Sequence, residues 1–477
     1  MSEKAQELFA AALEQERDIR FEAAQKTYQE LVEHFPAHEL AQQARGRLED
    51  LEHLQQEKAL YERIDENAKR VLTEIGMNIA ESQPLMDLLM EADAIDFDNS
   101  TALWVPLKRD YLERCLEQVP RQMPLDPGPN TFGTGATPPF LKRPDSDDLR
   151  AAEREEYQEI VKVVAQNQDV VGIFSLPVAP SKRITGHEVA QIMEAGFEGL
   201  KMTATNKWAD DEVAFLKDKD DWVDGTSLIV GLSPMNTMVG PFIRSARTGN
   251  NLLLLDLTIA GVTAPATPEG LLTQIHAQVL FMMVVAQTIT PGILCMHGGI
   301  PGVVESGGDL SYSSPHQPLI NTAMARLNTW ITKFPSAQSG GSTSLLDDME
   351  LAVRESQLSR NTMRKYGTHI VRHAFGAMAS LNFFSLEKFV ADCEHERQAL
   401  AKFRQASAQV GVLPMYLPQD HEVMEGIREI AEKGNPRNAD HTLRNVEAFD
   451  DWERAIIEAT RQKNPYPDIE DTVTIKL

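Results

Sequence analysis

The sequence predicts an α/β protein of the TIM type: a (β/α)8 barrel with an added N-terminal helical region. Short, largely apolar runs of four to seven residues recur along the chain without polar alternation, as expected of parallel strands buried on both faces. Each run is followed by a stretch with helical periodicity, and at least six such strand–helix units follow one another. So many units in succession favour a barrel over an open sheet.

Residues 1–58 have helical character, because their apolar residues are spaced by three and four, and Pro36 divides them into at least two helices. Part of this stretch resembles half of a tetratricopeptide repeat, but a repeat array needs about three units to bury its own core. We therefore expect residues 1–58 to form a helical hairpin that docks on the main domain or on a second subunit. The alternative is a surface that recruits a partner protein. Residues 59–477 are expected to form the barrel domain with its own leading helices.

The barrel domain opens with helices over residues 61–76, ending at Gly76, and over residues 106–119. Residues 125–144 are rich in Pro and Gly and are expected to form a loop, followed by a helix over 153–166. Strands are then predicted over residues 170–176, 200–203, 228–232, 252–255, 293–296 and 368–371. The helices that follow them are predicted over residues 187–195, 212–217, 242–248, 271–288, 319–333 and 386–403. Two weaker strands would complete the eight.

The composition argues against several classes of partner. The 477 residues include 46 Lys and Arg against 71 Asp and Glu, a net charge of −25, which would repel nucleic-acid phosphates and anionic membranes. The longest apolar run, residues 279–286, is far short of the roughly 18 residues that span a bilayer. The first residues are polar, and three cysteines are too few and too scattered for a disulfide framework. We expect a cytoplasmic protein that binds neither nucleic acid nor membrane.

Polar or titratable residues follow the predicted strands, at the end where (β/α)8 barrels carry their chemistry. They are Ser175, Thr203, Ser233, Asp256, His297 and His373. Asp256 directly follows an apolar run, where a carboxylate must be paired, solvated or bound to a cation. Glycines after the strands would let backbone approach a bulky ligand, although ordinary tight turns are the alternative.

Several familiar catalytic patterns do not occur in the sequence. It contains no dinucleotide-binding glycine motif, no phosphate loop and no serine-hydrolase elbow. His369 and His373 have the spacing of zinc ligands but lack the glutamate that accompanies it. Cys295, His297 and Cys393 are too scattered to favour a zinc site. We expect no metal site.

The order of several motifs resembles that of the trimethylamine and glycine-betaine methyltransferase family. The most specific motif is Ala-Gly-Val-Thr-Ala-Pro-Ala-Thr-Pro-Glu-Gly at residues 260–270, which continues through a long helix to Pro291-Gly292. Weaker matches extend the resemblance over roughly residues 60–460. Two positions depart from the family pattern: His316 stands where the family has an acidic residue, and Asn445 stands where it has a histidine.

This resemblance implies a barrel enzyme that moves a methyl group from an amine to the cobalt of a corrinoid (cobalamin), which a separate protein carries. The founding member has pyrrolysine in the loop that matches residues 339–343, where this chain has ordinary residues. The chain therefore resembles the non-pyrrolysine branch, which acts on quaternary amines such as glycine betaine. Such a donor leaves as a neutral amine and cobalt(I) is a strong nucleophile, so no covalent nucleophile is expected of the protein. Its task is to orient the N–CH3 bond.

The substrate is expected to bind at the ends of the strands. A methylated cation favours aromatic faces and carboxylates, and a betaine carboxylate favours Arg, His or backbone N–H groups. The expected substrate-binding residues are Asp256, His297, Glu305, Tyr312, His316, Arg372, His373 and Phe375. The loops expected to face the corrinoid contain Gly298, Gly299, Gly340 and Gly341. Two other readings remain: a sulfonium or other N-methyl donor, and a non-catalytic barrel that acts as a binding scaffold. The helical N-terminus also fits a homo-oligomer.

Overall fold

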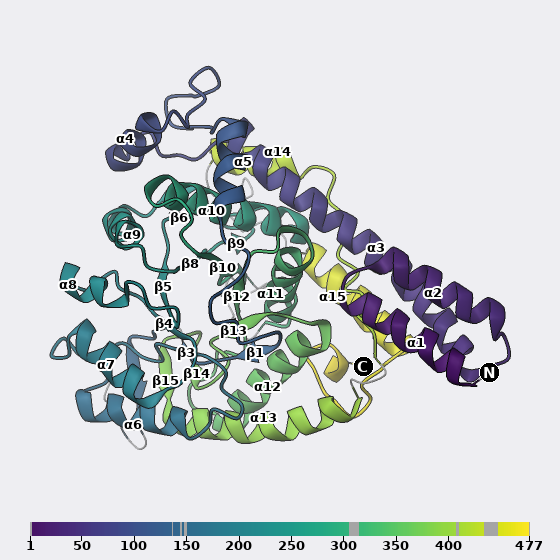
Figure 1. The fold of residues 1–477 in the computed structure, drawn as a ribbon. Helices are drawn as coiled ribbons and strands as arrows, with labels where there is room; N and C mark the ends of the chain where they lie inside the picture. The colour runs from purple at the N-terminus through teal and green to yellow at the C-terminus, as the bar shows by residue number, and fades with distance from the viewer. Residues whose placement is uncertain are drawn as a thin grey trace.

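The computed structural model describes residues 2–135, 137–143, 146, 150–304, 314–406, 410–433 and 447–476. Its centre is a closed parallel barrel (Figure 1). Eight strands are hydrogen-bonded in the order β1-β13-β12-β10-β8-β5-β4-β3. The two ends of this sheet meet beside β1 and β3, where Gly133 and Ile173 form a parallel bridge and the Gly172 N–H donates to the Phe132 carbonyl at 2.9 Å. The predicted (β/α)8 barrel is confirmed.

The barrel strands are short. They are β1 (Thr131–Phe132), β3 (Phe174–Ser175), β4 (Lys201–Thr203), β5 (Trp222–Thr226), β8 (Leu252–Leu254), β10 (Cys295–Gly299), β12 (Ser336–Ser339) and β13 (Ile370–Arg372). Three smaller sheets lie outside the barrel. They join β2 (Phe140–Lys142), β14 (Ala377–Met378) and β15 (Phe383–Ser385), then β6 (Ile229–Val230) and β7 (Ser233–Pro234), then β9 (Ile259–Ala260) and β11 (Gly302–Val303).

Helices surround the barrel strands. They are α6 (Arg154–Ala165), α7 (Gly186–Gly196), α8 (Asp210–Val213), α9 (Asn236–Thr248), α10 (Pro268–Ile289), α11 (His316–Leu327), α12 (Met349–Tyr366) and α13 (Leu386–Ala406). Short 3-10 or π-helical turns follow two of them, η2 (Ala214–Leu216) after α8 and η3 (Asn328–Thr332) after α11. α10 is long and apolar enough to cross a membrane, but 89% of its most apolar window is buried inside the protein. Its apolar character is therefore that of a core helix.

One predicted barrel strand is wrong. Residues 229–230 belong to the small β6–β7 hairpin, and β5 is the barrel strand at this point of the chain. Two further barrel strands, β1 and β12, were not assigned from the sequence, and β1 lies within the stretch predicted as a loop. The other five predicted barrel strands overlap or directly adjoin β3, β4, β8, β10 and β13.

The direction of each side chain follows from strand alternation. One apolar cluster contains a residue from each of seven barrel strands or their immediate neighbours and fills the barrel interior: Ile173, Met202, Val223, Leu253, Met296, Ala337 and Ile370. Val371, the next residue on β13, belongs instead to the cluster beneath the outer helices. Two residues beyond Ile370, Arg372 therefore points into the barrel at the C-terminal end of β13, the end we call the mouth.

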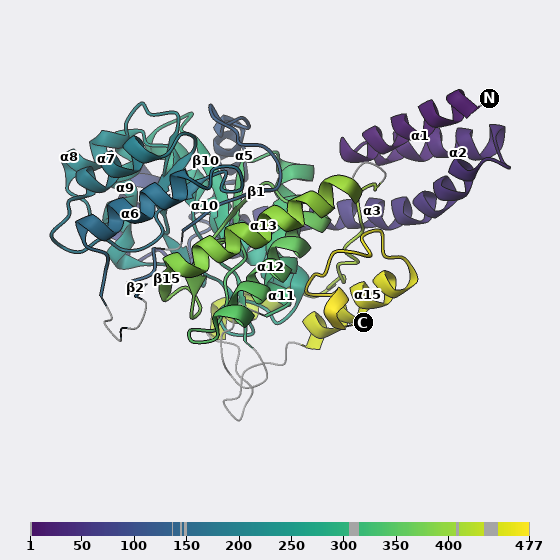
Figure 2. The same cartoon turned by 90° about the horizontal axis from the view of Figure 1, so that it is seen from below.

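Three N-terminal helices project from one side of the barrel (Figure 2). They are α1 (Ser2–Arg17), α2 (Phe21–His34) and α3 (Glu39–Arg70). α3 runs without a break through residue 58, where the sequence suggests a domain boundary, and continues as the π-helical turn η1 (Val71–Ile75). It ends at Gly76, whose positive φ of 83° suits glycine. The division at residue 58 stays a prediction. Two shorter helices, α4 (Gln83–Glu91) and α5 (Arg109–Gln118), follow.

An extended segment, residues 410–420, joins the N-terminal helices to the barrel. Three buried glutamates, one each on α1, α3 and α10, accept hydrogen bonds from its backbone N–H groups: Glu16 from Val412 at 3.0 Å, Glu57 from Met415 at 3.0 Å and Glu269 from Asp420 at 2.6 Å. Each glutamate is also paired with an arginine: Arg47, Arg326 and Arg63 respectively. The chain then continues through α14 (Val423–Lys433), α15 (Glu447–Gln462) and a final 3-10 turn, η5 (Thr474–Lys476).

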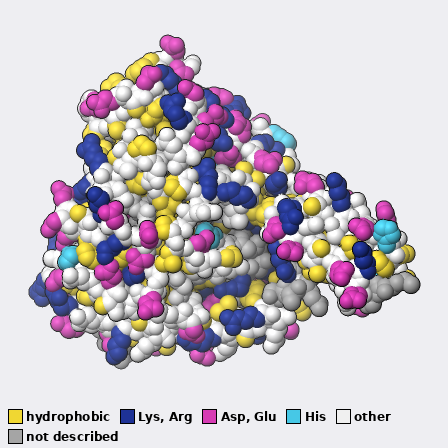
Figure 3. Space-filling view, viewed as in Figure 1, with side chains coloured by type: hydrophobic (Ala, Val, Ile, Leu, Met, Phe, Trp, Pro, Cys, Tyr) yellow, Lys and Arg dark blue, Asp and Glu magenta, His cyan; other side chains and the backbone are white. Residues whose placement is uncertain are grey.

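The surface is mixed in charge on the face that Figure 3 shows. Acidic and basic side chains are interspersed, mostly towards the periphery, and apolar side chains gather near the centre, over the barrel. No continuous basic area appears on this face. The excess of acidic residues expected from the sequence is therefore spread over this face and does not form one patch.

Candidate functional site

Arg372 is a charged side chain that strand alternation directs into the barrel mouth. Its guanidinium donates to three groups on or directly after the barrel strands: Nε to the Ala337 carbonyl at 3.1 Å, Nη2 to the Gly299 carbonyl at 3.2 Å and Nη1 to Nε2 of His373 at 3.3 Å. The side chain thus links β10, β12 and β13. These contacts fix the position of the guanidinium within the mouth.

The positive charge of Arg372 is buried without a matching carboxylate among the described residues. The residue is 3% exposed, and no ion pair with it occurs in the described part of the chain. Burial pulls the pKa of the guanidinium below its ordinary value. A buried charge is costly unless it is paired. A guanidinium has five N–H groups, so one on each Nη remains for a ligand, and this arrangement suits a bidentate carboxylate.

His373 and Ser339 complete a row of polar groups beside Arg372. Nδ1 of His373 lies 2.8 Å from Oγ of Ser339. Burial, and then the nearby charge of Arg372, hold the pKa of His373 well below its ordinary value, so its ring is neutral. Ser339 and Arg372 are directly opposite each other on the paired strands β12 and β13. Their side chains therefore leave the sheet on the same side, into the mouth.

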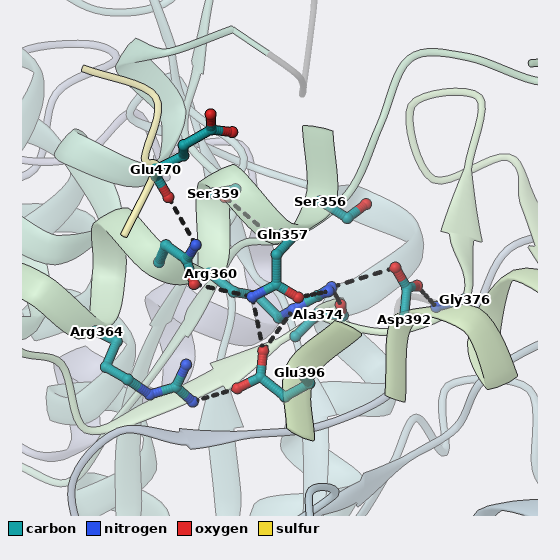
Figure 4. A network of polar contacts seen from close by, with 12 residues as sticks. Ser356, Gln357, Ser359, Arg360, Arg364, Ala374, Gly376, Asp392, Glu396 and Glu470 are labelled. Carbon is teal, nitrogen blue, oxygen red and sulfur yellow. Dashed lines mark hydrogen bonds and ion pairs between the residues drawn. The ribbon is translucent and has the colours of Figure 1, made fainter. Parts of the chain in front are cut away.

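A buried ionic network holds the loop that follows β13 (Figure 4). Arg360 on α12 donates to the Ala374 carbonyl at 2.5 Å, and Asp392 on α13 accepts from the Gly376 N–H at 2.8 Å. Both side chains are fully buried. This loop begins at His373, which has a left-handed backbone with φ of 65°, a conformation that persists only when its surroundings fix it. The network therefore supports the position of the His373 ring.

Asp256 follows β8 by two residues but does not face the mouth. Its carboxylate accepts from the Thr258 N–H at 2.8 Å and from Nε2 of Gln278 on α10 at 2.7 Å. Leu253 belongs to the barrel interior and Leu254 to the layer beneath the helices, so Asp256 shares the outward direction of Leu254. Burial raises its pKa to about 7. Its predicted contact with the substrate stays a prediction.

The raised pKa of Asp256 predicts a pH-dependent contribution to stability. The folded protein keeps the neutral acid up to about pH 7, whereas the unfolded chain ionises near pH 4. Between these values the folded state binds more protons, so stability falls as pH rises, by up to about 1.4 kcal/mol per pH unit. Relative to wild type, Asp256→Asn is expected to gain stability from pH 4 to pH 7, as measured by denaturant unfolding.

The control for this experiment is Asp93→Asn, because the Asp93 side chain is 87% exposed. Its unfolding free energy is expected to stay parallel to that of wild type over the same pH range. Parallel curves for Asp256→Asn and wild type would contradict the raised pKa.

His297 also points away from the barrel interior. Its Nε2 lies 3.1 Å from Nδ1 of His276 on α10, and Nε2 of His276 lies 3.0 Å from Asp65 on α3. Nδ1 of His297 lies 3.4 Å from the side-chain nitrogen of Gln338. Burial and the neighbouring His276 hold the pKa of His297 well below its ordinary value. The residue connects β10 to the helical layer, and its predicted role in substrate binding stays a prediction.

His316 and Phe375 lie in helical surroundings. His316 is the first residue of α11, and its Nε2 is 3.4 Å from Asp450 and 3.8 Å from Glu453 on α15. The ligand atoms of these three residues all lie within 4.8 Å of one another, a spacing that could hold a metal ion. The ring of Phe375 is fully buried and lies 5.0 Å from the guanidinium of Arg360. Neither residue is brought next to Arg372 by a contact between described residues.

Of the remaining predicted residues, Glu305 and Tyr312 lie outside the described residues. The four glycines expected to face the corrinoid are buried, and an added Cβ on each would contact the protein itself. The first contacts are Leu253 for Gly298 at 2.7 Å, Gln338 for Gly299 at 3.2 Å, Met363 for Gly340 at 2.2 Å and Ala374 for Gly341 at 2.8 Å. Close internal packing is therefore one reason for glycine at these positions.

Sequence reasoning did not propose Ser339 as a site residue, although it included the neighbouring glycines. β12 reads Ser-Ala-Gln-Ser and lacks the apolar run that identifies a buried strand. One indirect signal was available in the sequence. The pair Gly340-Gly341 follows Ser339, and glycines are expected where a chain leaves the end of a strand and packs closely against its neighbours. Recognising β12 would have placed Ser339 at the mouth.

Comparison with known proteins gives the family. A profile of the family described as trimethylamine methyltransferase (MTTB) matches residues 212–462, more than half of the chain. The chain belongs to the trimethylamine methyltransferase family. The protein is therefore a methyltransferase, and the resemblance seen in the sequence motifs is confirmed. The matched region contains Ser339, Arg372 and His373.

Two relatives of this trimethylamine methyltransferase family member match most of its length. Glycine betaine methyltransferase of Desulfitobacterium hafniense strain Y51 is 24% identical over 364 residues, 70% of this chain and 74% of that protein. Proline betaine:corrinoid methyltransferase of Eubacterium limosum is 22% identical over 376 residues, 70% of this chain and 75% of that protein. Among solved structures, monomethylamine methyltransferase of Methanosarcina barkeri has a TM-score of 0.45 at 11% identity and covers 83% of this chain and 86% of that chain.

Proposed function

We propose that the protein transfers a methyl group from a quaternary amine with a carboxylate, a betaine, to the cobalt of a corrinoid carried by a partner protein. Family membership supports methyl transfer. The names of the two relatives support a betaine donor and, for one of them, a corrinoid acceptor. The observation that carries the choice of donor is the guanidinium of Arg372 at the mouth, which has no carboxylate partner among the described residues.

Arg372 favours a donor with a carboxylate over trimethylamine. A bound carboxylate would neutralise the buried charge and use the N–H groups left on Nη1 and Nη2. Trimethylamine offers no anion, and as a protonated amine it would be repelled by the same guanidinium. A carboxylate held at a fixed point also orients the rest of a small betaine, and such positioning is worth several kcal/mol in a displacement reaction.

The protein then has to position the donor and leave the reaction path open. The corrinoid supplies the nucleophile, cobalt(I), when its carrier docks. Arg372 holds the carboxylate and thereby limits the directions in which the N–CH3 bond can point. The leaving group is a neutral amine, so the protein needs no general acid to expel it.

The test is corrinoid methylation with a panel of donors. The purified enzyme would be mixed with a reduced corrinoid protein, and the loss of cobalt(I) absorbance followed with glycine betaine, proline betaine, carnitine, trimethylamine and a dimethylsulfonium acid. We expect turnover with at least one carboxylated quaternary amine and none with trimethylamine. The control is the same corrinoid protein with a methyltransferase known to use it.

The other readings give different outcomes. Turnover with the sulfonium acid alone would replace the quaternary amine by a sulfonium donor and keep the role of Arg372. Turnover with trimethylamine alone would overturn the carboxylate argument. Failure with every donor, while the control enzyme works, would favour the non-catalytic scaffold. The homo-oligomer and the cytoplasmic location stay predictions.

A further inference from the structure

The contacts around His373 determine which ring nitrogen carries its proton. Nε2 lies 3.3 Å from Nη1 of Arg372, and a guanidinium N–H can only donate. Nε2 of His373 must therefore be the acceptor. Because the ring is neutral, Nδ1 carries the hydrogen. This hydrogen points at Oγ of Ser339, 2.8 Å away.

The direction of this bond leaves the Ser339 hydroxyl with a hydrogen to donate. Its oxygen accepts from His373, and no described residue accepts from it. The Ser339 backbone N–H is already bonded to the side-chain oxygen of Asn321 at 3.0 Å, which fixes the strand end. Ser339 is fully buried, and a buried hydroxyl is normally satisfied. The missing acceptor is therefore expected to be a ligand.

Ser339 lies beside Arg372 on the neighbouring strand, so a ligand bound by Arg372 would lie near the Ser339 hydroxyl. The two residues are direct partners on β12 and β13, and their side chains leave the sheet on the same side. His373 bridges them, since its ring contacts both Arg372 and Ser339. An anion on the free Nη groups of Arg372 would thus have a second donor nearby.

We propose that the Ser339 hydroxyl donates a hydrogen bond to the donor's carboxylate, with His373 as the positioning residue that orients this hydroxyl. The inference rests on the proposed function, and it adds a specificity-determining residue to Arg372. His373 then acts through Ser339 and Arg372 and does not itself contact the carboxylate. A donor without a carboxylate would leave both the hydroxyl and the guanidinium unsatisfied, and sites of this kind discriminate strongly.

The test is direct binding, measured by calorimetry on the full chain without corrinoid protein. Glycine betaine would be compared with choline, which has the same quaternary ammonium but a hydroxymethyl group in place of the carboxylate. Ser339→Ala is expected to weaken glycine betaine binding about 10- to 100-fold, the usual effect of losing a hydrogen bond to a charged group. Choline binding should change much less, and Ser339→Thr should restore most of the affinity for glycine betaine.

Ser336→Ala is the matched control. Ser336 lies on the same strand, but its hydroxyl bonds to Gln338 outside the barrel interior. We expect its affinity for glycine betaine to equal that of wild type. An equal loss for choline and glycine betaine in Ser339→Ala would show a structural effect and overturn the inference.

The role of His373 is tested by a double-variant cycle. His373→Asn suits the left-handed backbone at this position but cannot present the imidazole Nδ1–H to Ser339. We expect it to weaken glycine betaine binding, and the loss that it causes to be smaller in the Ser339→Ala background than in the wild-type background. Additive losses would show that His373 acts independently.

Failure of the inference can be told from failure of the proposed function. If wild type binds glycine betaine and Ser339→Ala binds it equally well, only the role of Ser339 is overturned. If wild type binds no carboxylated quaternary amine, the proposed donor class fails and the inference fails with it.

Discussion

Replacing Arg372 by glutamine is expected to abolish most turnover of a carboxylated donor while leaving the protein folded. Losing one partner of a buried, hydrogen-bonded charge pair costs about 2–5 kcal/mol, so kcat/KM with glycine betaine should fall roughly 30- to 5,000-fold. Arg372→Lys keeps the charge but loses the planar pair of donors, and we expect an intermediate loss. Steady-state methylation of a corrinoid protein measures both effects.

Stability separates a binding role of Arg372 from a structural one. In the described part of the chain the guanidinium is buried with no carboxylate, so its removal should not lower the melting temperature. Binding residues are often destabilising in this way. Arg121→Gln is the matched control, since Arg121 lies over the ring of Phe334 outside the barrel and should keep wild-type turnover. A marked loss of stability in Arg372→Gln with proportionate losses for every donor would contradict the assignment.

The largest effect on stability is expected at Glu57. Its carboxylate is 2.7 Å from Arg326, and both side chains are 2% exposed. The same carboxylate accepts from the Tyr61 hydroxyl at 2.8 Å and from the Met415 N–H at 3.0 Å. Glu57→Gln leaves the buried charge of Arg326 with backbone carbonyls but with no carboxylate among the described residues, so we expect a loss of about 3–5 kcal/mol in the free energy of unfolding. Denaturant unfolding measures this loss.

Two further variants test this prediction, one as a control and one as a partial rescue. Glu62 lies on the same helix, but it is 56% exposed and 3.7 Å from Lys58, so Glu62→Gln should change stability by less than about 0.5 kcal/mol. Adding Arg326→Met to Glu57→Gln removes the uncompensated charge and should restore part of the loss. Equal stability of Glu57→Gln and Glu62→Gln would show that the pair contributes nothing.

Glu57 also bears on the N-terminal helices. It lies within residues 1–58, whereas its partners Arg326 and Met415 belong to the barrel and to segment 410–420. Deleting residues 1–58 would remove this carboxylate and also Glu16, which binds Val412. Deletion of residues 1–58 is therefore expected to disturb folding, and this would obscure any effect on recruitment of a partner. Substitutions on the exposed faces of α1 and α2 are the better test of recruitment.

Two of the three barrel strands that the sequence did not reveal, β5 and β12, are polar. β5 reads Trp-Val-Asp-Gly-Thr, and its buried Asp224 is satisfied by Thr205 and Ser245. β12 reads Ser-Ala-Gln-Ser, and its buried polar side chains contact one another and His297 and His373. A search for apolar runs passes over both, because the partners that make burial of these side chains acceptable come from other strands and helices.

A similar limit applies to the choice of candidate site residues. Strand ends were identified well enough to select Arg372 and His373, which meet at the mouth. Asp256 and His297 were selected by the same rule, yet they face the helices. A shift of one residue along a strand exchanges its two faces. When a strand is apolar on both faces, its sequence does not indicate which residues point into the barrel.

The sequence by itself determined the fold class and the family. Strand–helix alternation and the motif at residues 260–270 are local patterns, so they can be recognised without knowing which residues are in contact. Only the tertiary structure decided that Arg372 lacks a carboxylate partner among the described residues and that Ser339 lies opposite it. Pairing of charges and register of strands are relations between residues far apart in the chain. They depend on how the barrel closes, and closure is set by all eight strands together.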